Sequence, residues 1–469
     1  MDYSVGLSNN RAEESRRTFL MGGLALMLTG GVALAKSDGR RKNIVFIIVE
    51  DLKAVLGCYG DKIVRTPNID RLAAQGMVFD RAYCQFPVCN PSRSSMLLGI
   101  RPDRTGIFNN VRSWRETVGD RVSLPRLFRS NGYHTVGLGK VFHGGAKHED
   151  PDAWNERYEY GPTERGRRGK RRNLTANVVR WCSWLAADGS DEDQPDGQLA
   201  VKAVEVLRQK RADPLFMIVG FHKPHDPFNA PKKYFDMYPL QQLEPPTVPN
   251  GVETIEKYSI GSSWKKAFDK FTLRDKREFL RAYYACVTFT DAQIGKVLDE
   301  LDRLRLWEDT AVFFVGDHGY ELGEHQWWNK NVLFEDSARV PLIAVVPGQT
   351  WVGSRCPALV EMVDLYPTFA HICGLQTPND LDGCSFKPLL SQPDSKWKTA
   401  AFTQLIRGGD VTGKSVRTDS WRYTQWRRGD ELLWQELYDH QNDPQEYRNL
   451  AESKKYQDTV KHLGRLLSP

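Results

Sequence analysis

The sequence has few of the features that identify small or specialised proteins. Its eight cysteines are scattered over 469 residues, and none has the C-x-x-C spacing typical of zinc sites. This excludes a small disulfide framework. Cys373 and Cys384 bracket a short loop and could pair, although a free buried thiol is the simpler expectation. We find no internal repeats, and no long apolar run follows residue 35.

The charge is also modest, with a formal net value of +6. One stretch is dense in cations: "ERGRRGKRRN", residues 164–173. It either attracts a polyanion or forms a solvated or disordered basic loop. Since no nucleic-acid motif or base-stacking aromatic pattern accompanies it, we expect no nucleic-acid partner.

The N-terminus has the parts of an export signal. Arg16 and Arg17 precede a moderate apolar run that ends in Ala33-Leu34-Ala35. A basic pair, a short apolar core and an A-x-A end predict a twin-arginine signal over residues 1–35. The run is short for a membrane span, so an uncleaved anchor helix is the weaker alternative. We expect the twin-arginine translocase to export the chain to the periplasm or the outside, without stable membrane insertion of the mature chain.

Alternating strands and helices predict an α/β fold. Four apolar runs read as buried strands: residues 43–51, 133–143, 214–225 and 310–319. Helical patterns separate them, the longest at 276–306. This order favours a large, mostly parallel sheet sandwiched by helices, in a catalytic domain over 40–385. After a linker near 385–400, alternating residues predict a smaller antiparallel subdomain with a closing helix, residues 400–469.

The four predicted strands share one feature: each ends in charged or imidazole side chains. The carboxyl ends of parallel strands meet at one edge of a sheet, where ligands bind. Glu50, Asp51, Asp317 and His318 would bring three carboxylates and an imidazole there, which suits a hard cation such as Ca²⁺ or Mg²⁺. The alternative is that the last pair merely caps a turn. Nearby positive or titratable groups suit an anionic substrate: Lys140, His143, His225 and Lys330.

Cys89 is the remaining candidate. It lies in "CQFPVCNPSRSS", residues 84–95, five positions after Cys84. A helix beginning near Cys89 would favour an anion at that point. The residues alone leave open a disulfide, a metal ligand, a thiolate nucleophile or a cysteine that must be modified before it acts.

The segment from Cys89 to Arg93 resembles the C-x-P-S-R motif of type I sulfatases, in which the cysteine is oxidised to formylglycine. "GLGKVFH", "GFHKPH" and "GDHGYELGEHQWWNK" are similar to the iduronate-2-sulfatase branch of that family. The resemblance covers nearly the whole chain from Asn43. It implies an alkaline-phosphatase/sulfatase-like fold, one Ca²⁺ ion, and a formylglycine-generating enzyme that converts Cys89 to 3-oxoalanine.

The resemblance also implies roles for the site residues. The hydrated aldehyde at position 89 would attack sulfur, and Arg93 would hold the hydrate or the metal carboxylates. Sulfate oxygens would be bound by Lys140 and Lys330. His225 would protonate the leaving alcohol, and His143 would take the second hydrate proton. The metal ligands would be Asp51, Asp317, His318, the hydrate oxygen at Cys89 and Glu50. Glu50 departs from the family, which usually has two consecutive aspartates there.

The sequence therefore predicts an exported sulfatase that acts on sulfated sugars, with the 2-O-sulfate of iduronate or a similar uronate as the best candidate. The segment 164–173 would supply a cation for the sugar carboxylate. Two alternatives remain: a phosphate or phosphonate monoester hydrolase of the same superfamily, and an inactive homologue that binds sulfated glycans.

Overall fold

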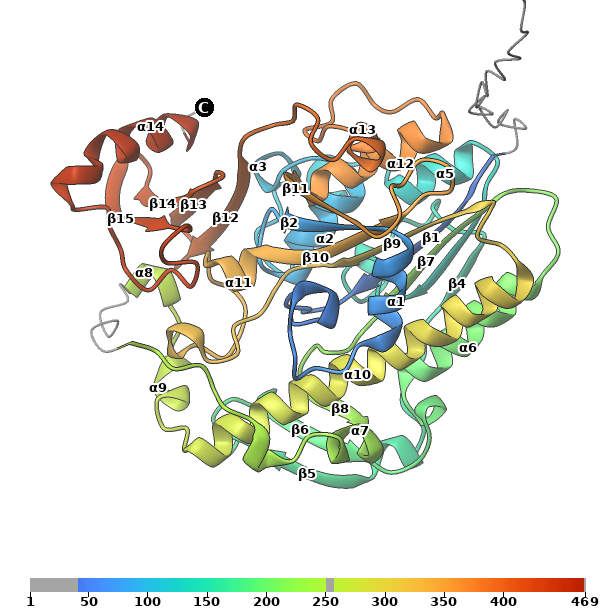
Figure 1. Ribbon diagram of the computed structural model, residues 1–469, viewed down its shortest axis with the longest axis horizontal. Coiled ribbons are helices and arrows are strands. Elements are labelled where there is room, and N and C mark those ends of the chain that lie inside the picture. The colour runs from blue at the N-terminus through green and yellow to red at the C-terminus, as the bar shows by residue number, and fades with distance from the viewer. Residues whose placement is uncertain (1–40, 250–256, 468–469) are drawn as a thin grey trace, which may run out of the picture. The chain divides into compact units, whose positions relative to one another are not determined.

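The computed structural model describes residues 41–249 and 257–467, so the predicted export signal lies outside the described residues. Its centre is an eight-stranded sheet with the order β11-β2-β10-β9-β1-β7-β3-β4 (Figure 1). Only β10 in this sheet runs antiparallel to its neighbours. The strands are β1 (Asn43–Val49), β2 (Met77–Tyr83), β3 (His134–Gly139), β4 (Glu156–Tyr158), β7 (Leu215–Phe221), β9 (Thr310–Gly316), β10 (Arg339–Val345) and β11 (Ser354–Glu361).

The central strands are apolar on both faces because helices cover both faces. Alternate residues of β1 belong to two different cores, with Val45 in one and Phe46 in the other. One face carries α1 (Pro67–Gln75), α6 (Pro195–Arg208) and α10 (Leu273–Leu304); the other carries α2 (Cys89–Leu98), α5 (Leu124–Ser130), α12 (Leu365–Cys373) and α13 (Lys387–Ser391) (Figure 1). The predicted fold class is confirmed.

Short elements fill the connections of this layer. Two short helices, α3 (Pro102–Thr105) and α4 (Arg115–Val118), precede β3. After β7 follow α7 (Lys232–Asp236), α8 (Lys257–Ile260) and α9 (Lys265–Phe268), and α11 (Glu335–Ala338) precedes β10. The long helix α10 begins at a capping box in which Thr272 and Asp275 bond each other's backbone N–H groups.

A second, three-stranded sheet was not predicted. It consists of β5 (Gly169–Asn173), β6 (Ser183–Ala187) and β8 (Phe228–Pro231), in the order β5-β6-β8. Residues 169–173 of the basic segment form β5, so this part is not a disordered loop, while most of the side chains of 164–171 are exposed. Arg172 is held by ion pairs to Asp275 and Glu278 of α10.

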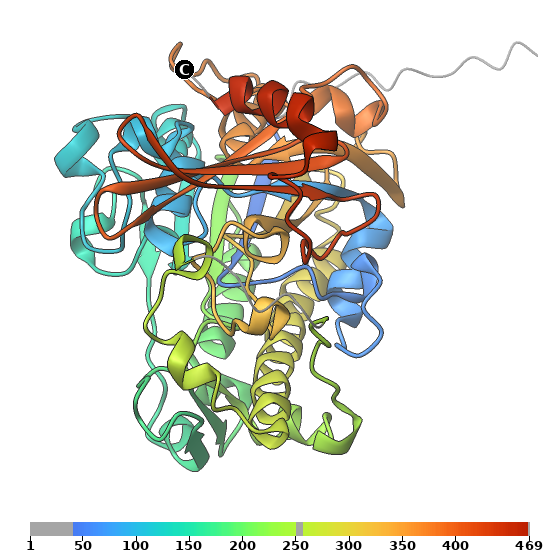
Figure 2. The ribbon, with the colours of Figure 1, turned by 90° about the vertical axis from the view of Figure 1, so that its left-hand side faces the viewer.

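The C-terminal part forms a four-stranded antiparallel sheet and a closing helix, as predicted. The strands are β12 (Ala401–Arg407), β13 (Val411–Arg417), β14 (Trp421–Arg428) and β15 (Glu431–Asp439), followed by α14 (Gln457–Leu467) (Figure 2). The segment expected to be a linker differs from that expectation. It contains α13, and Lys398 forms ion pairs with Glu361 and Asp364. Its charges thus bind it to the main body.

Two further expectations can be compared with the described residues. All eight cysteines are free, so Cys373 and Cys384 do not form a disulfide. Among the residues with assigned structure, no helix combines the length and apolar character that crossing a membrane requires. The boundaries at 385 and 400 remain predictions.

Candidate active site

The ends of β1 and β9 bring the predicted carboxylates together. These strands are neighbours in register, with Val49 opposite Gly316, so the residues that follow them meet. The backbone N–H of Asp51 donates to Asp317 Oδ1 at 2.9 Å, and the N–H of Asp317 donates to Val49 O at 3.1 Å. Asp51 has a φ of 58°, the left-handed region that a non-glycine residue rarely adopts. The chain therefore turns sharply at this point.

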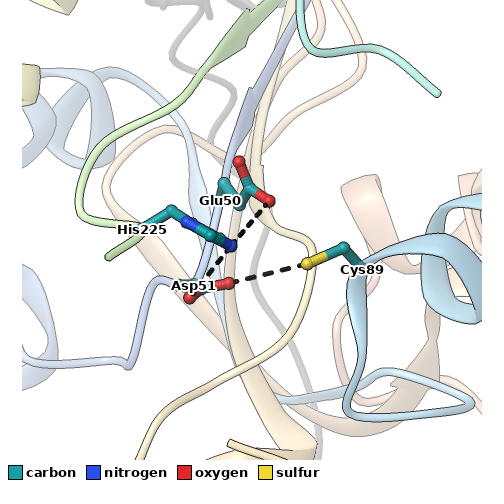
Figure 3. A group of neighbouring side chains, drawn as sticks. All are labelled: Glu50, Asp51, Cys89 and His225. Atoms are coloured by element: carbon teal, nitrogen blue, oxygen red, sulfur yellow. Dashed lines mark hydrogen bonds and ion pairs between the residues drawn. The ribbon is translucent and has the colours of Figure 1, made fainter. Parts of the chain in front are cut away.

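Cys89 reaches the same point from the first turn of α2. Its Sγ lies 3.3 Å from Lys330 Nζ, 3.5 Å from His318 Nε2 and 3.9 Å from Asp51 Oδ1. Figure 3 shows it facing Glu50, Asp51 and His225. The side chain is fully buried, and this burial raises the pKa of the Cys89 thiol despite the nearby lysines. An unmodified Cys89 is therefore a poor thiolate nucleophile.

Three cations neutralise the buried carboxylates. Lys330 Nζ bonds both oxygens of Asp51, at 2.6 and 2.7 Å. Lys140 Nζ bonds Glu50 Oε1. Arg93 Nε bonds Asp317 Oδ2 at 2.8 Å. Each carboxylate thus has its own cation, as buried charges require.

Nearby positive groups also decide whether these carboxyl groups are protonated. Burial opposes ionisation of Glu50, but His225 and Lys140 hold its pKa well below the ordinary value. Burial is likewise outweighed at Asp317, whose pKa is lowered by His318 and Arg93. Both groups are ionised at neutral pH, which a cation ligand requires.

The three histidines of the prediction differ in position. His318 donates from Nδ1 to Gly319 O at 3.0 Å, which leaves Nε2 directed at Cys89 Sγ and Asp51 Oδ1. His225 Nε2 lies 3.5 Å from Glu50 Oε1 and 4.0 Å from Asp51 Oδ2, and its side chain is 29% exposed. It is therefore the imidazole of this group that a substrate can reach.

His143 packs against His148, with ring centroids 5.0 Å apart. Burial, Lys140 and His148 lower the pKa of His143 to about 3. Its Nδ1 is buried and has no hydrogen-bond partner. His143 is therefore neutral at working pH, and its lowered pKa makes it a weak base.

The donor set fits a divalent cation. Ligand atoms of Glu50, Asp51, Cys89 and His225 lie within 4.8 Å of one another, and so do those of Cys89, Asp317 and His318. The two groups share Cys89. Three of these six residues are carboxylates, which favour Ca²⁺ or Mg²⁺ over a soft metal. The structure thus brings Glu50 into a group that could hold a cation, despite its extra methylene.

The sequence reasoning missed three residues of this region. Asp226 is buried beside His225, with Oδ1 3.9 Å from Nδ1 of that ring, and burial raises the pKa of Asp226. Tyr320 donates to Asp226 Oδ2 at 3.4 Å, and Tyr283 donates to Asp51 O at 2.6 Å. The position of Asp226 directly after His225 was an available signal, and so was that of Tyr320, two residues after His318. Tyr283 lies in an apolar helical pattern that indicates only burial.

Comparisons with known families agree with this geometry. The family model "Sulfatase" matches residues 42–375. A second model, described as the C-terminal part of N-sulphoglucosamine sulphohydrolase, matches residues 323–468.

Individual proteins are similar over most of the chain. Iduronate 2-sulfatase of Mus musculus is 33% identical, with 87% of this chain and 89% of the relative covered. A phosphonate monoester hydrolase from Silicibacter pomeroyi has a TM-score of 0.77 at 22% identity, with 91% and 94% covered. An enzyme solved with its substrate D-glucosamine-2-N,6-O-disulfate has a TM-score of 0.72 at 21% identity, with 91% and 97% covered. At such identities the solved structures show the fold alone.

Proposed function

Because the chain belongs to the sulfatase family, and is therefore a sulfuric ester hydrolase, we propose that it removes the 2-O-sulfate of iduronate, or of a similar uronate, in polysaccharide fragments. The observation that carries the proposal is the position of Cys89, among Lys330, His318 and Asp51 at the edge of the sheet. The similarity to iduronate 2-sulfatase supports the choice of sugar.

Two groups that the family implies would complete this site. When present, formylglycine at position 89 would supply a hydroxyl nucleophile, and Ca²⁺ would withdraw charge from the sulfate oxygens. Asp51, Asp317 and His318, with Glu50, would hold the cation. A cation there would replace Lys330 and Lys140 as the partners of the carboxylates. Both ammonium groups would then be free to bind sulfate oxygens.

The other side chains divide the proton transfers between them. His225, partly exposed and next to the carboxylates, would donate a proton to the leaving sugar hydroxyl. His143, neutral at working pH, would accept the proton that accompanies sulfate release. Arg93 is fully buried, and its bond to Asp317 would orient that carboxylate. Two imidazoles in different environments suit a reaction that needs both an acid and a base.

Export belongs to the same proposal. The signal grammar of residues 1–35 supports the twin-arginine route to the periplasm or the outside. That route carries folded chains, so the formylglycine-generating enzyme would act on Cys89 before export.

Parallel assays test the proposed substrate. We expect sulfate release from a 2-O-sulfated iduronate disaccharide to exceed release from a 6-O-sulfated glucosamine by at least about 10²-fold in kcat/KM, since a misplaced ester loses the near-attack geometry. Faster hydrolysis of a phosphonate monoester would favour the alternative hydrolase. Tight disaccharide binding without product from protein carrying formylglycine would favour the inactive glycan-binding alternative.

A further inference from the structure

The C-terminal sheet has a face that α14 covers only in part. Val416, Tyr423 and Leu437 lie side by side on β13, β14 and β15. They pack against Val460 and Leu463 of the helix. In Figure 2 the helix lies across the sheet, and the strands extend beyond it. The packing of α14 therefore does not account for the side chains on the uncovered part of this face.

Side chains change character where the helix ends. Two residues farther along each strand, on the same face, Lys414 lies opposite Gln425, and Gln425 opposite Gln435. The next pair is Thr412 and Arg427. A groove of about 770 Å³ runs over these residues, with α14 as its wall. Its polar floor distinguishes it from the apolar seam under the helix.

The groove has more basic than acidic side chains. Four basic residues line it, against the two carboxylates of Asp103 and Asp430: Lys414, Arg427, Lys461 and Arg465. Lys414 pairs with Asp103 at 3.0 Å, and Lys461 lies 3.7 Å from the exposed Asp458.

The two arginines are the more informative. Arg427 donates to the backbone oxygen of Asp430. Within 41–249 and 257–467, neither Arg427 nor Arg465 has a carboxylate within ion-pair distance. A guanidinium without a carboxylate can bind a sulfate group through two parallel hydrogen bonds.

The floor between these cations is a fixed row of hydrogen-bonding groups. Gln425 Nε2 donates to the hydroxyl of Tyr423 at 2.9 Å, and that hydroxyl donates to Gln435 Oε1 at 2.9 Å. Tyr423 is only 1% exposed, so this row is held in place from below. Amide and hydroxyl groups between cations suit a ligand that carries both sugar hydroxyls and anionic groups.

We infer that this groove is a second binding site, which holds a sulfated polysaccharide chain outside the active site. The inference rests on the proposed function for the identity of the polymer. The opposite face of the sheet packs against the active-site loops, with Trp426 beside Phe86 and Leu333, and Arg407 bonded to Asn331 O at 2.6 Å. Polymer held in the groove is thereby kept at a high effective concentration near Cys89.

The experiment compares two triple variants of the full chain in a Cys89→Ala background. The groove variant carries Arg427→Ser, Lys461→Ser and Arg465→Ser. The control carries Lys62→Ser, Lys210→Ser and Lys270→Ser, three exposed cations elsewhere, and thus has the same net charge. Affinity is measured for long heparin chains, a heparin disaccharide and a DNA duplex of matched charge. The same triples with Cys89 intact are assayed for turnover, and thermal unfolding confirms folding.

We expect the groove variant to lose at least about tenfold in affinity for long heparin, with a weaker salt dependence. The control variant and the disaccharide affinity should stay unchanged, and KM should rise for the polymer only. Equal heparin affinity of the two variants would contradict the proposed binding site. So would a wild-type affinity for the DNA duplex equal to that for heparin. If the groove variant loses affinity for heparin but no form of the enzyme hydrolyses the disaccharide, the second binding site is supported and the proposed function is contradicted.

Discussion

His225 is the imidazole that lies against the site carboxylates and is still reachable by a substrate. If it protonates the leaving alcohol, His225→Ala should lower kcat/KM for the sugar sulfate by about 10²–10⁴-fold. An aryl sulfate should lose much less, because a phenolate leaves without a proton. Sulfate release from both substrates checks this.

The matched control for that experiment is His222→Gln. His222 lies in the same segment, but its ring is bound to Asp196 at 3.0 Å rather than to Glu50. It should retain activity on both substrates. An equal loss on sugar and aryl sulfates in His225→Ala would contradict proton donation by this residue.

Substitution of Asp317 tests the proposed cation site. Ca²⁺ at 100 times its dissociation constant should stabilise the wild-type chain by about 2.7 kcal/mol, because it binds only the folded state. Asp317→Asn removes a charged donor and should abolish most of this stabilisation by Ca²⁺. Asp213→Asn, at an exposed position, should retain it. An equal Ca²⁺ response in both variants, measured by thermal unfolding after chelation, would place the cation elsewhere.

Among the elements, β11 and β12 are connected through a buried charge cluster. Glu361, at the end of β11, bonds both guanidinium nitrogens of Arg101, at 2.8 and 2.7 Å, and Lys398 at 2.6 Å. Lys398→Met would leave Glu361 and Asp364 with one cation fewer. We expect a loss of about 3–5 kcal/mol in urea unfolding at neutral pH. Lys396→Met, two residues away and exposed, should cost little.

The same cluster has a defined pH dependence. Burial opposes ionisation of Glu361, yet Lys398 and Arg101 lower its pKa from the ordinary 4.5 to about 2. A depressed carboxyl pKa stabilises the fold fully above the unfolded value and loses this effect as pH falls through the folded one. The difference between wild type and Lys398→Met should therefore shrink between about pH 4.5 and pH 2. A constant difference would contradict this assignment.

The sequence predicted most of the elements that carry the site. The runs that became β1, β3, β7 and β9 are continuous and apolar, and their polar ends are visible in the sequence. The sheet β5-β6-β8 was missed because its strands are short and β5 is almost wholly basic, "GKRRN". Its stability depends on ion pairs with α10, which lie about a hundred residues away in the chain. Asp226 follows His225 directly in the sequence, but only the fold shows that its carboxyl is buried.

Across the whole molecule, a buried network joins the C-terminal sheet to the catalytic part. Arg422 of β14 bonds Glu446 and Glu335, and the latter begins α11. Each carboxylate keeps one other basic partner once this shared cation is removed, so Arg422→Met should destabilise the chain by about 3 kcal/mol. Arg428→Met, on the same strand, breaks an exposed pair with Asp410 and should leave the free energy of unfolding nearly unchanged.

Calorimetry extends this prediction to cooperativity. Since the sheet also covers Phe86 and Leu333 beside the active-site loops, we expect residues 41–467 to unfold in one transition, and a chain cut at residue 385 to fail to fold. Two separate transitions in the wild type would contradict this coupling.

The chemical state of position 89 tests the central claim most directly. Mass spectrometry of the tryptic peptide 82–93, from protein alkylated after isolation from its native host, should show one alkylated cysteine, Cys84, and a free or hydrated aldehyde at position 89. Stoichiometric alkylation of both cysteines in catalytically active protein would contradict the formylglycine mechanism, and a disulfide between them would contradict the assignment of Cys89 to catalysis.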